Sequence, residues 1–226
     1  MVQMIDTSEM PEEIGKAITK LSNTQNRIEN KDFAAQDPTQ ERIKRELSFS
    51  HYQYLYKTGD EITDSTSQIS FDEAIVALAC LWNDVSYASI AKKNVGALSD
   101  DITKAPYKAL FNLSTNAFEL LNSVLAVREI EKILQGIKNS SSGKKYSACV
   151  HGNRLIEHVA LQTIRNSGGF SNSVLNFLMF NSLYEQMIKN IVKKIADELA
   201  TTYIDSYPAN VFKNQTKCKT LAEKAK

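Results

Sequence analysis

The residues best suited to chemistry lie in an amide-rich segment between residues 20 and 40. The set whose side chains could bind a ligand comprises Asn23, Gln25, Asn26, Arg27, Lys31 and Asp32. A side-chain amide offers a donor and an acceptor together, so it can pair with base edges, while arginine and lysine can contact phosphates. The segment therefore predicts a surface for nucleic acid or another polar ligand.

A structural interpretation of the same segment stays open. Asparagine and aspartate often bond to nearby backbone in loops, and Asp32 and Asp37 are suited to capping helices. Replacing Asn23 and Gln25 with alanine separates the two hypotheses. Lost stability without a specific loss of function would indicate the structural role.

A second polar set lies in the C-terminal half of the chain. His151, Arg154, Glu157 and His158 have spacings of three, four and seven, which place them on one helical face. Such a face could supply the general acid and base of a helical ribonuclease of toxin type. The alternative is a polar face between helices in which Glu157 pairs with Arg154. The two histidines could also bind zinc, but the sequence offers no obvious third ligand.

Other enzyme signatures are missing from the sequence. The Glu-x-Lys at 29–31 follows no apolar strand bearing an aspartate, which a metal-dependent nuclease would require. Ser167-Gly168-Gly169 lacks the lysine and hydroxyl residue of a phosphate-binding loop. The three cysteines, Cys80, Cys149 and Cys218, have no metal-ligand spacing. We therefore expect no metal and no other cofactor, and we favour a non-catalytic chain while the ribonuclease alternative stays open.

The overall charge does not indicate a class of partner, because a net charge of +1 is too small to attract nucleic acid or membranes. Basic residues form local groups such as Lys92-Lys93, Lys144-Lys145 and a lysine-rich tail, and their convergence in space would favour nucleic-acid binding. The odd, widely spaced cysteines fit a reducing cytoplasm. No apolar stretch approaches the roughly 20 residues of a membrane span.

The elements that must position these groups are mainly helices, since proline and glycine are sparse and apolar residues recur at helical spacing. Asp37-Pro38 predicts a helix start, and Ser70 with Glu73 predicts a capping box. Helices are expected over residues 11–22, 37–47, 70–82, 85–93, 105–112, 115–138, 147–166 and 171–201.

One strand is expected at residues 52–57. There Tyr52, Tyr54 and Tyr56 share a face, which favours packing beneath helices over stacking on bases. The polar segment 60–69 is the predicted linker. The chain is thus expected to be mainly α, a helical bundle with a small N-terminal α/β portion of one or two strands.

This division places the amide-rich segment in the smaller portion, residues 1–60, and the helical domain at 61–226. The smaller portion contains a recognisable pattern. It runs Asn23-Thr24-Gln25-Asn26-x-Ile28-x-x-x-Asp32-Phe33-x-x-x-Asp37-Pro38-x-Gln40, followed by Tyr54-x-Tyr56-Lys57-x-Gly59. The pattern resembles the AIPR family, the abortive-infection phage-resistance proteins of bacteria. Ile28 and Phe33 stand where the family usually has valine and leucine, and both keep an apolar side chain.

The resemblance is closest over about residues 1–112 and general beyond them. It implies the C-terminal region of a phage-defence protein, without the nuclease-like part that usually lies upstream. Such a region would contribute nucleic-acid contact, sensing or assembly to a nuclease domain or partner protein. Two alternatives remain: a helical ribonuclease that uses Arg154 and His158, and a structural module that forms a homodimer through its long apolar helices.

Overall fold

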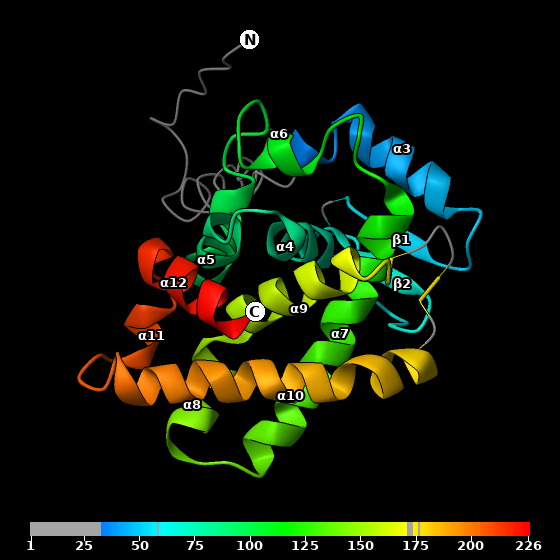
Figure 1. Ribbon diagram of the computed structural model, residues 1–226. Coiled ribbons are helices and arrows are strands. Elements are labelled where there is room, and N and C mark those ends of the chain that lie inside the picture. The colour runs from blue at the N-terminus through cyan, green and yellow to red at the C-terminus, as the bar shows by residue number, and fades with distance from the viewer. Residues whose placement is uncertain (1–32, 58, 171–173, 176) are drawn as a thin grey trace, which may run out of the picture.

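The computed structural model describes residues 33–57, 59–170, 174–175 and 177–226. Within them lie ten α-helices, one 3-10 helix and a two-stranded sheet (Figure 1). The predicted fold class, mainly α with a small α/β portion, is confirmed. The helices are α3 (Pro38–Leu47), α4 (Phe71–Leu81), α5 (Ser86–Lys93), η1 (Val95–Leu98), α6 (Tyr107–Leu110), α7 (Ala117–Asn139), α8 (Gly143–His151), α9 (Asn153–Asn166), α10 (Phe177–Thr201), α11 (Pro208–Val211) and α12 (Gln215–Ala225), and the strands are β1 (Gln53–Leu55) and β2 (Gln68–Ser70).

Helix α4 occupies the centre of the fold, and α10 lies across one side of the molecule (Figure 1). All residues from Ala74 to Leu81 are buried, and α4 packs against α5, α6, α7 and α9. A helix that is apolar on every side must be surrounded in this way. The predicted capping box at its start is confirmed, with Ser70 and Glu73 each bonding to the other's backbone N–H. The buried apolar residues form one cluster that includes positions from Ala34 to Ala225.

Helix α3 begins as predicted. The Asp37 side chain accepts a hydrogen bond from Thr39 N at 2.8 Å, and Pro38 takes the first helical position. Gln40 is buried and bridges two tyrosines: Tyr54 Oη donates to Gln40 Oε1 at 2.6 Å, and Gln40 Nε2 donates to Tyr107 Oη at 3.0 Å. These contacts fix α3 to the strand and to α6.

The tyrosine face of the strand is packed inside the protein, as predicted. Tyr52, Tyr54 and Tyr56 are at most 5% exposed, so they form no platform for bases. The second strand, β2, lies at the end of the segment for which the sequence predicted a linker, and it pairs with β1 in parallel. The predicted helix over 11–22 lies outside the described residues.

The prediction of one helix over residues 147–166 is wrong, because α8 and α9 are separate helices joined at Gly152. Helix α8 also begins at Gly143, before the predicted start at residue 147. A Cβ atom built on Gly152 would lie 2.7 Å from the Phe212 ring and 2.7 Å from Ala148 O. The glycine therefore lets α11 approach the junction of the two helices.

We predict that Gly152→Ala destabilises the protein by about 1–3 kcal/mol, because the new methyl group overpacks this junction. Gly136→Ala is the matched control, since nothing lies within 4 Å of a Cβ at that position in α7. It should gain about 0.5–1 kcal/mol from helix propensity. Urea denaturation measures both. If Gly152→Ala proves as stable as Gly136→Ala, the close approach of Phe212 does not exclude a side chain at position 152.

Candidate functional site

The amide-rich segment lies outside the described residues, so its role as a ligand surface stays a prediction. This holds for its whole set: Asn23, Gln25, Asn26, Arg27, Lys31 and Asp32. The described end of the same pattern is structural. Asp37 caps α3, and Gln40 lies buried between two tyrosine hydroxyls.

Three residues of the second polar set meet at Cys80 in the middle of the fold. Arg154 Nη1 lies 2.7 Å from Glu157 Oε2, and the Cys80 thiol donates to the same carboxylate at 3.5 Å. His158 Nδ1 lies 3.0 Å from the Cys80 carbonyl oxygen. His151 is elsewhere, at the end of α8, with its ring 6.1 Å from that of Tyr207. The break at Gly152 separates it from the other three.

Glu157 is a fully buried carboxylate with a cation beside it. Its exposed fraction is 0%, and burial raises the pKa of its carboxyl while the Arg154 guanidinium opposes that rise. Burial alone would lower the pKa of Arg154, but the charge of Glu157 and that of Glu131 turn the shift upward. A buried ion pair of this kind is costly to break from one side, because the remaining charge has no partner.

His158 joins α9 to the end of α4. The last carbonyls of a helix have no partner within it. His158 bonds to the Cys80 carbonyl, and Gln162 Nε2 donates to Leu81 O at 2.5 Å and to Trp82 O at 3.0 Å. Because a carbonyl can only accept, the imidazole must hold its proton on Nδ1. Desolvation lowers the pKa of His158 to about 4, with the Cys80 bond opposing the shift.

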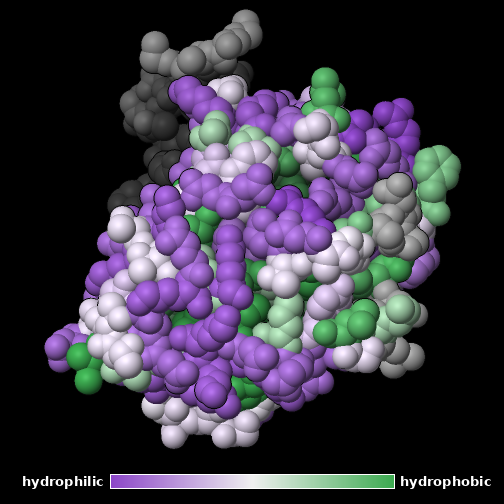
Figure 2. Space-filling model, in the orientation of Figure 1, coloured by the Kyte–Doolittle hydropathy of each residue, from purple (hydrophilic) through white to green (hydrophobic). Residues whose placement is uncertain are grey.

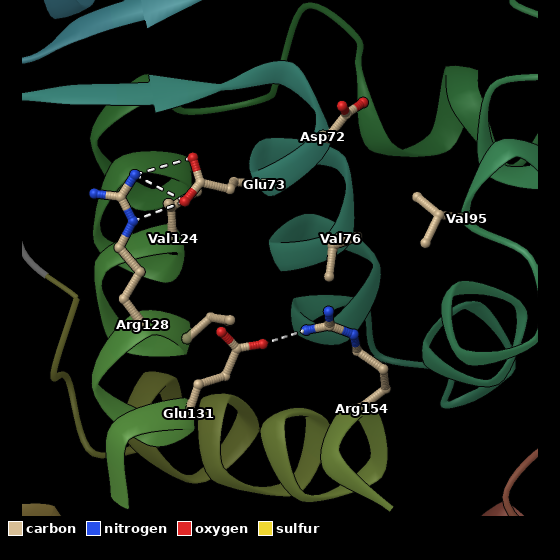
Figure 3. Close-up of a pocket in the computed structure, with 9 residues that line it drawn as sticks. Asp72, Glu73, Val76, Val95, Val124, Arg128, Glu131 and Arg154 are labelled. Atoms are coloured by element: carbon tan, nitrogen blue, oxygen red, sulfur yellow. Dashed lines mark hydrogen bonds and ion pairs between the residues drawn. The ribbon is translucent and has the colours of Figure 1, made fainter. Parts of the chain in front are cut away.

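Arg154 also reaches a pocket between α4 and α7 (Figure 3). The pocket has a volume of about 280 Å³. Its walls are the side chains of Val76, Val95, Val124 and Val127, and its polar rim consists of Asp72, Glu73, Arg128, Glu131 and Arg154. Figure 3 shows two arginine–glutamate pairs on the rim, Arg128 with Glu73 at 2.8 Å and Arg154 with Glu131 at 3.1 Å.

The Arg128 pair holds the sheet to α7. Arg128 Nη1 donates to Ser65 O at 2.6 Å, and Nη2 donates to Gln68 O at 2.8 Å. The same guanidinium binds both carboxylate oxygens of Glu73, the residue of the α4 capping box. Sequence reasoning found the capping box but missed Arg128, because contacts 55 to 63 residues apart leave no local pattern.

The pocket offers room for a small apolar group, with charges that are already paired at its rim. In the ranges that the structure describes, no three histidine, cysteine, aspartate or glutamate side chains gather as a metal site would need. Nor does any helix of that part combine the length and hydropathy of a membrane span.

The protein is mainly helical. Arg154, Glu157 and His158 form its polar centre, in which each candidate acid or base group bonds to another helix. The sequence model of the family described as AIPR protein matches residues 1–226, so the chain belongs to the AIPR family. This match extends the resemblance beyond residue 112. Membership supports a role in abortive infection and phage resistance. Comparisons with curated proteins and with solved structures gave no significant match.

We predict that Arg154→Met costs about 3–5 kcal/mol of stability, because it leaves the Glu157 carboxylate buried without its cation. The double variant Arg154→Met/Glu157→Met removes both charges and should be more stable than Arg154→Met alone. Glu157→Met completes the cycle. Chemical denaturation of the four proteins checks this, and a double variant no more stable than Arg154→Met would contradict a coupled ion pair.

We also predict a loss of stability in mild acid. The pKa of His158 is about 4 in the folded protein and near 6.5 in the unfolded chain, so the unfolded chain binds more protons between those values. Stability should therefore fall by up to about 3 kcal/mol as pH drops from 6.5 to 4. His158→Asn keeps a donor for the Cys80 carbonyl but cannot titrate. Denaturation across this pH range should show a shallower dependence in the variant; parallel curves would refute the assignment.

Proposed function

We propose that this chain acts in phage defence as a non-catalytic region that binds nucleic acid and presents it to a nuclease domain or partner protein. The amide-rich segment with Asn23, Gln25, Asn26 and Arg27 makes the contact. The observation that supports a non-catalytic role is the geometry of the polar centre. Each of its acid and base groups is bonded to another helix.

A general acid or base must come within hydrogen-bond distance of the proton it transfers. Glu157 is 0% exposed and His158 is 2% exposed. His158 also bonds to the Cys80 carbonyl, and its pKa of about 4 keeps the imidazole neutral at pH 7. These properties disfavour the ribonuclease alternative that uses Arg154 and His158.

The family supplies the other support. AIPR membership gives the phage-defence setting, and the amide and basic residues of the motif have the chemistry to contact bases and phosphates.

The test is binding of the purified chain to short single- and double-stranded DNA and RNA across a salt series. We expect affinity to fall with salt, and to be weakened at each salt concentration by Arg27→Ala and by Asn23→Ala. Arg45→Ala is the matched control, because Arg45 is an exposed arginine on α3 outside the motif. The RNA should remain intact throughout.

Two results would contradict the proposal. Absence of binding at low salt would exclude nucleic-acid contact, and a concentration-dependent mass in the same samples would favour the homodimer alternative. Cleavage of RNA that His158→Asn abolishes, in a folded variant, would favour the enzyme.

A further inference from the structure

A lysine-lined groove runs between α8 and α10, which lie side by side in the fold (Figure 1). It has a volume of about 510 Å³. Its polar lining includes Lys144 and Lys145 from the first turn of α8, and Gln186, Lys189, Asn190 and Lys193 from α10. Two basic groups that are far apart in the sequence therefore meet on one surface.

The helical spacing of α10 accounts for its side of the groove. Residues 186, 189, 190 and 193 follow one another at steps of three, one and three, which keeps them on one face. The opposite face carries Ile188, Val192 and Ile195, each at most 1% exposed. Because the apolar face packs inward, the lysine face must point outward. Figure 2 shows mostly hydrophilic residues on this side of the molecule, with apolar ones in scattered spots.

The charge of the groove is positive after its acidic neighbours are included. Asp197 lines one end, and Glu185 pairs with Lys189 at 2.6 Å. Lys144 donates to the Ile204 carbonyl at 3.2 Å, which fixes its position without neutralising it. Within the described part of the chain, Lys145 and Lys193 form no ion pair. Four lysines thus face two carboxylates, in a chain whose net charge is only +1.

We propose that this groove binds the sugar–phosphate backbone of a nucleic acid, an inference that rests on the proposed function and adds a second contact surface to it. Lysine is a flexible point charge, so it neutralises phosphates without selecting a base. None of the described residues that line the groove is aromatic, so these residues offer no platform on which single-stranded bases stack. The contact is therefore independent of sequence and suits a duplex.

The experiment compares three full-length proteins by fluorescence anisotropy with labelled duplexes of two unrelated sequences. Lys145→Gln/Lys193→Gln removes the two groove lysines that form neither an ion pair nor a hydrogen bond with other described residues. Lys93→Gln/Lys219→Gln is the control, because it removes the same charge from exposed positions outside the groove. Circular dichroism and thermal melting should be unchanged in both, since all four side chains are exposed.

We expect both duplexes to bind the wild type equally. The groove variant should bind more than about tenfold more weakly at low salt, and the slope of log affinity against log salt should become shallower by about 2. The control should keep the wild-type affinity and slope. Equal behaviour of the groove variant and wild type, or equal losses in groove and control variants, would overturn the proposal.

Two further arms separate the remaining outcomes. Polyglutamate that competes as well as unlabelled duplex would assign the groove to an acidic protein and refute a nucleic-acid site. Arg27→Ala tests the amide-rich segment in the same assay. If Arg27→Ala abolishes binding while the groove variant binds normally, the groove inference fails and the proposed function stands.

Discussion

The structure depends on how the backbone carbonyls at the buried C-terminal end of α4 obtain hydrogen-bond donors. A helix with no exposed face cannot give its last carbonyls to water, so another element must supply donors. Helix α9 does so with His158 and Gln162, and its Glu157–Arg154 pair lies against Cys80 of the same turn. This junction fixes α9 against α4. Because α7 and α10 pack on both the junction and α8, it also sets the positions of the pocket and the groove.

Local signals predicted the local structure. Asp37 with Pro38 begins α3, Ser70 with Glu73 begins α4, and the apolar spacing over 115–138 matches α7 closely. The sequence failed where the cause is distant. The Phe212 ring lies where a Cβ of residue 152 would be, at the junction of α8 and α9, and Arg128 binds backbone 60 or more residues away. The small helix α12 has few apolar residues, yet it buries Cys218 and Leu221 against the core.

The candidate sites show the same contrast between features set by local sequence and features set by distant contacts. The spacing of Arg154, Glu157 and His158 predicted a shared face, and the three do meet, where each bonds to another helix and Glu157 and His158 are buried. The sequence pattern does not indicate whether a polar side chain is buried, because burial depends on which helix packs against it. Of the groove's lysines, only Lys144 and Lys145 were visible as a basic group in the sequence, because Lys189 and Lys193 belong to α10, far along the chain from α8.

The central claim is that His158 is a neutral link between α9 and α4. Nuclear magnetic resonance of the imidazole nitrogens measures both its pKa and its tautomer in the intact chain. The structure predicts a proton on Nδ1 and a pKa of about 4. A pKa near 6.5, with the proton on Nε2, would mean an accessible histidine and would contradict this account.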